Sequence, residues 1–156
     1  MTLKELRLSK NLTQEETARI LGITRKTYYS YEQGKISENS LKYKYIVKAL
    51  QEVGLIDEEH GILTLEQIKN ICTEVFKDYS VEYCYLFGSY AKGSAKETSD
   101  VDLLVSTSVT GMGFFGLVET LREKLCKKVD LLDARQLENN NALVQEILKY
   151  GIKIYG

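Results

Sequence analysis

One stretch of this 156-residue sequence limits its possible folds more than any other: a Gly-Ser pair, then ten residues, then an Asp-Val-Asp triplet. The apolar run 81–87 predicts a buried strand. Gly88 and Ser89 predict a sharp turn at its end, because glycine tolerates backbone angles that other residues avoid. Beyond the turn, apolar residues alternate with Asp100 and Asp102, which predicts a second strand. Both carboxylates should therefore leave the sheet on the same side, with Cβ atoms roughly 7 Å apart.

Two carboxylates this close repel each other, and a divalent cation would allow both to stay ionised. Mg²⁺ prefers carboxylate and water oxygens together with substrate phosphates. A Gly-Ser turn offers backbone N–H groups and a hydroxyl to a phosphate. An Asp-x-Asp triplet alone is more often a solvated strand face. The Gly-Ser turn at this distance instead favours metal-assisted transfer from a nucleoside triphosphate.

The finer pattern GSYAKGSAKETSDVDLLV resembles the signature of the DNA-polymerase-β-like nucleotidyltransferase superfamily, in particular its smallest branch, the minimal nucleotidyltransferases. The matching positions are Gly88, Ser89, Ala91, Lys92, Gly93, Ala95, Ser99, Asp100, Asp102 and Leu103. The resemblance implies that Asp100 and Asp102 are catalytic and hold two Mg²⁺ ions, with ATP as the substrate. It further implies that the nucleotide is bound by Gly88, Ser89, Lys92 and Ser99. For Lys92, a solvated surface lysine is the alternative.

In this family a third metal carboxylate comes from a neighbouring strand in a Val-Asp-Leu setting. Residues 128–133 predict such a strand, and Asp130 matches the setting. Asp130 and Asp133 should point to opposite faces of it. At most one of them can therefore belong to the site, and we predict that Asp130 is the third catalytic and metal-binding residue.

The rest of the second half predicts an α/β (α+β) domain with a small mixed sheet. Thr64 is a good N-cap for a helix to about residue 77, whose apolar residues recur at three- and four-residue spacings. These residues are Leu65, Ile68, Cys72, Val75 and Phe76. A second amphipathic helix is expected over 117–125, and the tail 142–155 predicts a helix and a strand that resemble the family's ending. The glycine-rich segment 107–116 predicts a loop, either a mobile flap over a base or partner or an ordinary connection.

The first fifty residues predict an all-α bundle of short helices. Thr13, with Glu16 three residues later, has the pattern of a capping box. Gly22 should end that helix and Thr24 should cap the next. Two short helices around a glycine-containing turn are typical of a helix-turn-helix. A further helix should close the small core through Leu41, Ile46, Val47 and Leu50.

The segment LTQEETARILGITRKTYYSYEQGK resembles the phage-repressor (XRE-type) helix-turn-helix family. The resemblance implies that the helix after Thr24 is the recognition helix and lies in the major groove. DNA contacts are then expected from Gln14, Thr24, Arg25, Lys26, Tyr29 and Ser30. Tyr28 and Tyr31 are expected in the core. The alternative is a dimerisation or protein-binding bundle that does not contact DNA.

Charge divides the chain in the same way. Residues 1–50 carry ten Lys and Arg against five Asp and Glu, whereas residues 51–156 carry eleven against seventeen. We therefore expect a DNA-binding domain at 1–57 and a nucleotidyltransferase domain at 62–156. No apolar run approaches the ~18 to 20 residues of a membrane helix, and the first residues lack a signal-peptide core. Three widely spaced cysteines indicate reduced thiols, so we expect a cytoplasmic protein.

Together the two resemblances imply a nucleotidyltransferase that moves AMP from ATP onto a protein. Minimal family members often pair with a HEPN-type toxin. The resemblance therefore implies an antitoxin that adenylylates a toxin tyrosine and represses its own operon as a homodimer on operator DNA. Two alternatives remain open. One is a nucleotide-sensing transcription regulator without transfer activity, and the other is a nucleotidyltransferase of antibiotics or other small molecules.

Overall fold

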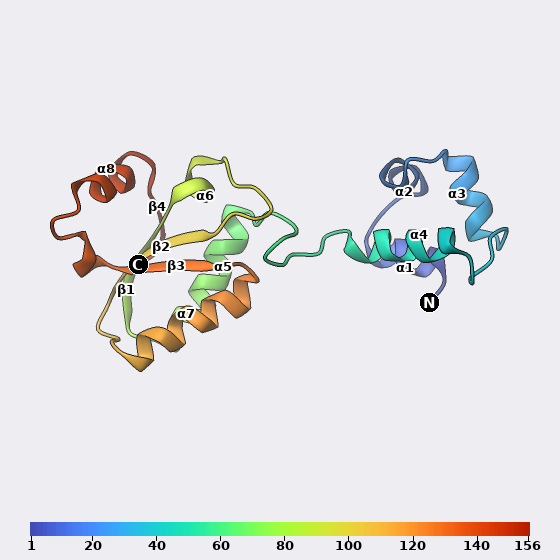
Figure 1. Ribbon diagram of the computed structural model, residues 1–156. Coiled ribbons are helices and arrows are strands. Elements are labelled where there is room, and N and C mark those ends of the chain that lie inside the picture. Colours follow the sequence, from blue (N-terminus) through green and yellow to red (C-terminus); the bar gives the residue numbers. More distant parts are fainter. The chain divides into compact units, whose positions relative to one another are not determined.

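A computed structural model describes all 156 residues, which form two compact units, Met1–Leu55 and Ile56–Gly156 (Figure 1). The sequence predicted domains at 1–57 and 62–156, whereas the two units meet between Leu55 and Ile56. Residues 56–61 therefore pack with the second unit instead of forming a free linker. None of the helices is both long enough and apolar enough to cross a membrane.

The first unit consists of four helices, as its capping signals predicted. They are α1 (Leu3–Ser9), α2 (Gln14–Leu21), α3 (Arg25–Glu32) and α4 (Leu41–Glu52). The Thr13 hydroxyl accepts a hydrogen bond from the Glu16 backbone N–H, and the Glu16 carboxylate accepts one from the Thr13 N–H, which completes the capping box. Gly22 ends α2 in the left-handed conformation, and the Thr24 hydroxyl caps α3.

A small apolar core joins these helices. Its buried residues are Leu3, Leu6, Ala18, Tyr28, Ile46 and Leu50. The predicted core position of Leu41 is wrong, because this side chain is 85% exposed. Leu41 lies five residues before Ile46, which on an α-helix is a rotation of about 140°. Leu41 therefore faces outward while Ile46 and Leu50 face the core.

The second unit contains the mixed four-stranded sheet, in the order β3-β2-β1-β4. The elements are α5 (Leu65–Phe76), β1 (Val81–Phe87), α6 (Gly88–Lys92), β2 (Val101–Thr107), α7 (Met112–Leu125), β3 (Val129–Asp133), the 3₁₀ turn η1 (Ala134–Leu137), α8 (Asn141–Tyr150) and β4 (Ile152–Tyr155). β1 runs antiparallel to β2 and β4, whereas β2 and β3 are parallel. The parallel pair is possible because α7 crosses over between its two strands.

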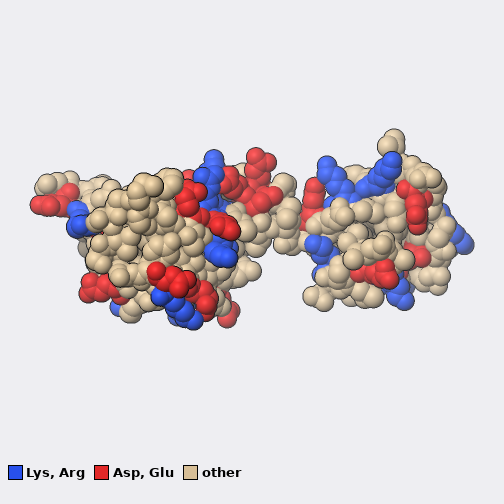
Figure 2. Space-filling view, turned by 90° about the horizontal axis from the view of Figure 1, so that it is seen from below, with Lys and Arg blue, Asp and Glu red and all other residues tan.

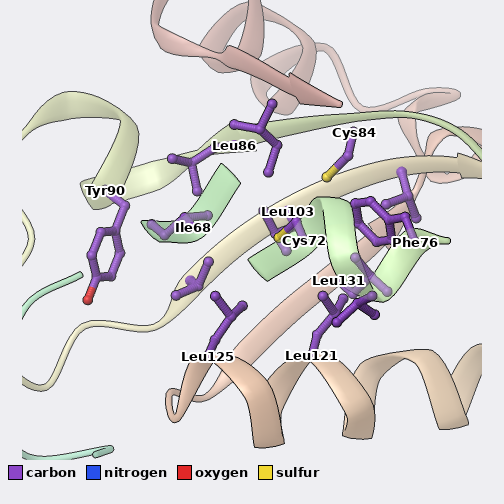
Figure 3. Close-up of a cluster of buried hydrophobic side chains, with 14 of the residues drawn as sticks. Ile68, Cys72, Phe76, Cys84, Leu86, Tyr90, Leu103, Leu121, Leu125 and Leu131 are labelled. Atoms are coloured by element: carbon purple, nitrogen blue, oxygen red, sulfur yellow. The ribbon is translucent and has the colours of Figure 1, made fainter. Parts of the chain in front are cut away.

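Helices α5 and α7 cover one face of this sheet and form the larger core (Figure 1). Figure 3 shows Ile68, Cys72 and Phe76 of α5 meeting Leu121 and Leu125 of α7 beneath the strands. The predicted apolar face of α5 is therefore largely confirmed. Its first residue, Leu65, is the exception at 46% exposed, because it lies on the first turn at the margin of the core.

The loop prediction for residues 107–116 is wrong over its second half. Helix α7 begins at Met112, so Phe114 and Phe115 lie on its first turn. Phe114 packs against the core, whereas Phe115 is 59% exposed. Glycines weaken helices in isolation, but packing of an apolar face overrides that preference. The flap alternative is therefore replaced by a helix start.

Candidate functional site

The three predicted carboxylates lie on neighbouring strands. Asp102 is the second residue of β2, and its backbone pairs with Asp130 on the parallel strand β3. Asp100 precedes β2 by one residue and is exposed, as is Asp130, while Asp102 is half-buried. Because directly paired residues of adjacent strands project to the same side of a sheet, Asp102 and Asp130 share one face.

The pKa of Asp102 is raised to about 6, because this carboxyl is partly buried and has acidic neighbours. Burial is the largest cause, followed by the charges of Asp130 and Asp100, and then by Glu146 of α8. Lys92 acts in the opposite direction. Asp102 therefore lies at the centre of a group of four acidic side chains with one nearby lysine.

Gly88 brings the turn after β1 into contact with this carboxylate. Phe87 at the end of β1 is paired with Asp102, so the next residue begins α6 beside it. Gly88 has a positive φ of 69°, and a Cβ there would fall 2.0 Å from Asp102 Oδ2. Only glycine fits this position without displacing the carboxylate. Ser89, which follows, is half-buried.

Two other residues predicted to bind nucleotide already have partners within the chain. Lys92 Nζ lies 2.9 Å from Glu146 Oε1 and 5.1 Å from the centre of the Tyr150 ring. The contact with Glu146 raises the pKa of Lys92. Ser99 Oγ accepts a hydrogen bond of 2.8 Å from the Lys96 N–H. Lys92 thus lies close to the acidic group, whereas the Ser99 hydroxyl closes a local turn.

Asp133, the other acid of β3, is placed elsewhere. It is buried, and its carboxylate accepts hydrogen bonds from the Arg135 backbone N–H and guanidinium at the start of η1. The guanidinium bond is the main reason why the pKa of Asp133 is lowered. Asp133 is therefore occupied as a cap, away from Asp102.

The donor set of this face suits Mg²⁺, although the chain forms no closed metal cage. No three His, Cys, Asp or Glu side chains are gathered tightly enough to hold an ion by themselves. Mg²⁺ commonly uses one or two carboxylates and completes its shell with water and substrate phosphates. After burial, the charges of Asp130 and Asp100 are the next causes of the raised pKa of Asp102, and a bound cation would offset these charges.

Sequence reasoning missed the residues that reach this site from distant segments. Glu146 and Tyr150 come from α8, where the sequence predicted a helix but assigned no residue to the site. Lys127 is fully buried although lysine is usually a surface residue. No local pattern marks any of the three, because each acquires its partners through the fold.

In the first unit, the predicted DNA-contacting residues gather around α3. Arg25, Lys26 and Tyr29 are exposed on this helix. The other predicted contacts have internal partners. Thr24 Oγ accepts from the Thr27 N–H, and the Ser30 hydroxyl donates to the Thr27 carbonyl.

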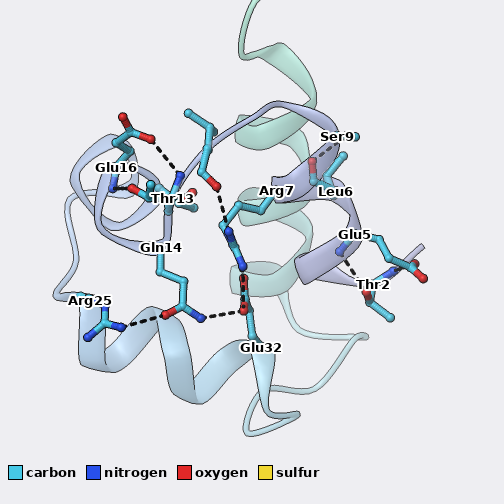
Figure 4. A network of polar contacts seen from close by, with 12 residues as sticks. Thr2, Glu5, Leu6, Arg7, Ser9, Thr13, Gln14, Glu16, Arg25 and Glu32 are labelled. Atoms are coloured by element: carbon cyan, nitrogen blue, oxygen red, sulfur yellow. Dashed lines mark hydrogen bonds and ion pairs between the residues drawn. The ribbon is translucent and has the colours of Figure 1, made fainter.

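Gln14 belongs to a polar network that connects α1, α2 and α3 (Figure 4). Its Nε2 donates to Glu32 Oε2 at 2.9 Å, and its Oε1 accepts from Arg25 at 3.4 Å. Arg7 pairs with Glu32 at 2.6 Å inside the unit and also donates to the Leu12 carbonyl. Burial tends to raise the pKa of Glu32, but hydrogen bonds from Arg7 and Gln14 lower it overall. The network therefore holds the amino end of α2 against α3.

The space-filling view agrees with the uneven charge of the sequence. On the face in Figure 2, the first unit, at the right, carries blue basic side chains along its margin with red acidic ones among them, and the second unit carries larger red clusters with some blue. A basic surface is the electrostatic feature that nucleic-acid binding requires.

Two family models match the chain, one in each unit. The helix-turn-helix model matches residues 3–50, and the model described as polymerase beta, nucleotidyltransferase matches residues 66–156. These ranges contain, respectively, the α2–α3 pair and the carboxylate face with its Gly-Ser turn.

Named relatives match the second unit. A candidate protein adenylyltransferase of Methanocaldococcus jannaschii is 41% identical over 75 residues, covering 44% of this chain and 87% of the relative. The protein adenylyltransferase MntA of Thermococcus cleftensis is 38% identical over 88 residues, 53% of this chain and 89% of MntA. A crystal structure described as a toxin-antitoxin with AMP-PNP aligns with a TM-score of 0.50 and 27% identity, covering 56% of this chain and 73% of that chain.

Proposed function

Since this chain belongs to the polymerase-β nucleotidyltransferase family and carries a helix-turn-helix domain, we propose that it is a Mg²⁺-dependent adenylyltransferase that moves AMP from ATP onto a protein. The observation that carries the proposal is the position of Asp102. This residue lies beside Asp130, near Asp100, and against the Gly88 turn. Acidic oxygens next to a glycine turn suit the binding of a metal–triphosphate.

The chain's own residues have separate roles in this reaction. Asp100, Asp102 and Asp130 would hold two Mg²⁺ ions, which when bound stabilise charge on the entering and leaving oxygens. Gly88 and Ser89 bind the β- and γ-phosphates. Asp130 accepts the proton of the attacking hydroxyl. A bond forms between that oxygen and the α-phosphorus, the bond from the α-phosphorus to the bridging oxygen breaks, and pyrophosphate leaves.

Lys92 and Ser99 complete the proposed nucleotide site. Lys92 is the one basic group that lowers the pKa of Asp102. Its ammonium group can therefore bind a triphosphate when its ion pair with Glu146 is broken. Ser99 acts through the turn that it closes before Asp100. The support for Lys92 is its electrostatic effect on Asp102, and the support for both roles is their place in the family pattern.

The proposed acceptor is a toxin protein of the HEPN type, and the chain is its antitoxin. Support comes from the relatives named protein adenylyltransferases and from the structural neighbour described as a toxin-antitoxin with an ATP analogue. An exposed tyrosine hydroxyl of the toxin would be the attacking group. Its modification would block the toxin.

A transfer assay tests the enzyme. Purified chain, Mg²⁺ and α-phosphate-labelled ATP are mixed with the product of the adjacent gene. We expect label on that protein, and loss of about a thousandfold in rate for Asp102→Asn, because several kcal/mol of charge stabilisation disappear. Asp78→Asn is the matched control. Asp78 is an exposed acid that precedes the start of β1, whereas the Gly88 turn of the site follows the other end of this strand.

Two results would reject the enzyme assignment. One is undiminished turnover in Asp102→Asn that is folded by circular dichroism. The other is absence of label on any protein although ATP binds. If nucleotide then changed the affinity for operator DNA, the sensor-regulator alternative would replace the enzyme. Label on an aminoglycoside would instead favour the small-molecule alternative.

We also propose that the first unit binds operator DNA as a homodimer and represses its own operon. The support is the helix-turn-helix match and the exposure of Arg25, Lys26 and Tyr29 on α3. Gln14 would contact phosphate from the start of α2. Phage-repressor-type dimers bind two half-sites about one helical turn apart.

Binding to the promoter of the chain's own gene tests this role. Arg25→Ala should cost about 1–3 kcal/mol if Arg25 reads a base. Lys48→Ala, an exposed basic residue on α4, is the control and should change affinity little. A footprint without inverted repeats would contradict the homodimer, and equal loss in both variants would indicate non-specific charge attraction.

A further inference from the structure

Lys127 is the only lysine among the buried residues of the chain, and every hydrogen of its ammonium group has an acceptor within the fold. Nζ donates to the carbonyl of Glu97 at 2.6 Å, of Gly61 at 2.7 Å and of His60 at 3.1 Å. An ammonium has three donors and no acceptor, so its capacity is fully used. Burying a charged group is costly unless it is satisfied in this way.

The three carbonyls belong to two segments that are far apart in the sequence. Glu97 lies in the turn that leads to Asp100, while His60 and Gly61 lie in the segment before α5. A second contact joins the same segments, because the Gly61 N–H donates to Glu97 Oε1 at 3.1 Å. Lys127 therefore connects the turn before Asp100 to the segment before α5 through hydrogen bonds.

Asp100 depends on this turn more than the other acids depend on theirs. Asp102 and Asp130 are held by the register of β2 and β3. Asp100 lies outside β2, between a turn and a strand. The Val101 N–H donates to the Lys128 carbonyl at 2.9 Å and fixes the strand side.

On the other side of Asp100, hydrogen bonds between Lys96 and Ser99 fix the shape of the turn, but they do not fix its position relative to the rest of the second unit. The Ser99 N–H donates to the Lys96 carbonyl at 3.0 Å, and the Lys96 N–H donates back to Ser99 Oγ at 2.8 Å. Both bonds lie within the turn. The bond from Lys127 to the Glu97 carbonyl connects this turn to the residue two positions before β3, the strand that carries Asp130.

We propose that Lys127 is a positioning residue that sets the place of Asp100 relative to Asp102 and Asp130, and thereby the affinity of the site for a divalent cation. The inference rests on the proposed function, because that function assigns the cation to these acids. Lys127 has no donor left for a triphosphate, so it acts only through the turn. Groups that orient metal ligands commonly change metal affinity 10- to 100-fold when they are removed.

The test measures Mn²⁺ binding to the full chain without ATP or acceptor, and amide hydrogen exchange in peptides that cover residues 94–101. Lys127→Met should weaken Mn²⁺ binding about 10- to 100-fold and speed exchange in these peptides, with β1 and α7 unchanged. Lys128→Met, the exposed neighbour, is the matched control and should resemble the natural chain.

A second variant keeps the inference testable if Lys127→Met does not fold. Glu97→Ala leaves Lys127 and its carbonyl acceptor intact but removes the bond to the Gly61 N–H. It should speed exchange in residues 94–101 and weaken Mn²⁺ binding by a smaller factor. Unchanged Mn²⁺ affinity and unchanged exchange in Glu97→Ala and in any folded Lys127→Met would overturn the inference.

These readouts separate the inference from the proposed function. If Asp102→Asn abolishes Mn²⁺ binding but the natural chain transfers no AMP, the proposed function fails and the role of Lys127 is still measured. If the natural chain transfers AMP and Lys127→Met binds Mn²⁺ as tightly, only the role of Lys127 fails. If the natural chain binds no Mn²⁺ at these acids, both fail.

Discussion

The two units of this chain bury charge in different ways. The first unit encloses an ion pair, Arg7 with Glu32, whose side chains are 9% and 2% exposed. The second unit has an apolar core, and its candidate site gathers Asp100 and Asp130, both exposed, around the half-buried Asp102. Its one fully buried charge, Lys127, has backbone carbonyls as partners instead of a second ionised side chain.

Core size explains why the two units can differ in this way. The apolar core of the first unit has six buried residues, whereas that of the second has sixteen. A small core gives little stability, so a specific polar network has a larger share in fixing how the helices pack. A larger core can offset the electrostatic repulsion between acids at its edge. The second unit can therefore hold the acids of the candidate site close together.

Breaking the buried ion pair should give the largest effect on stability. Arg7→Met leaves Glu32 buried without its cation, which typically costs about 3–5 kcal/mol. Hydrogen exchange measured at increasing denaturant concentration should show that peptides of residues 1–55 lose protection at a lower concentration than in the natural chain. Peptides of residues 56–156 should be unaffected.

The matched control is Arg122→Met in the second unit. Arg122 pairs with Glu58, but both side chains are well exposed, at 45% and 39%. Exposed ion pairs contribute about 0–1 kcal/mol. Equal destabilisation by Arg7→Met and Arg122→Met would contradict the expectation that the buried ion pair of the first unit stabilises the fold more than the exposed pair of the second.

The first unit was the more predictable one from sequence, because its helices are defined by local signals. Thr13, Gly22 and Thr24 occupy the caps that their residue types predicted. In the second unit the same held for Thr64, which caps α5 with Gln67, and for β1, whose limits the apolar run marked. Capping and strand patterns depend on residues only a few positions apart, so they can be read directly.

Cap removal tests whether this local logic has equal weight in both units. Thr13→Ala and Thr64→Ala each remove a hydroxyl that accepts from the backbone N–H three residues later. Each should cost about 1 kcal/mol, observed as faster exchange in α2 or α5 alone. The serine variants should restore most of the loss. Spread of either effect beyond its own helix would show that the cap supports tertiary packing as well.

The parts that sequence could not supply are those made by distant segments. The pattern placed Asp100, Asp102 and Asp130 in the chain, but the pairing of β2 with β3 brings the last two together. Nothing near Lys92 in sequence indicated Glu146, which is 54 positions away and reaches it from α8. Lys127 could not be separated from its exposed neighbour Lys128 before the fold placed it beneath the turn.

The smallest expected effect is on the free energy of unfolding, which the acids gathered around Asp102 lower at neutral pH. The folded pKa of Asp102, about 6, lies above its ordinary value, so the folded chain binds this proton more tightly than the unfolded chain. The contribution of this group to stability therefore falls as pH rises from about 4 to 6 and stays unfavourable above that range. Removing the charge should make the chain more stable at neutral pH.

Denaturation of Asp102→Asn in EDTA between pH 4 and 8 measures this directly. The variant should exceed the natural chain by up to about 1 kcal/mol at pH 7, a value discounted for solvent screening because Asp102 is only half-buried. The difference should shrink as pH falls through 6. Asp78→Asn separates the loss of one negative charge from the effect of burial. A variant that is less stable than the natural chain at pH 7 would show that the acids of the second unit support its fold as Glu32 supports the first.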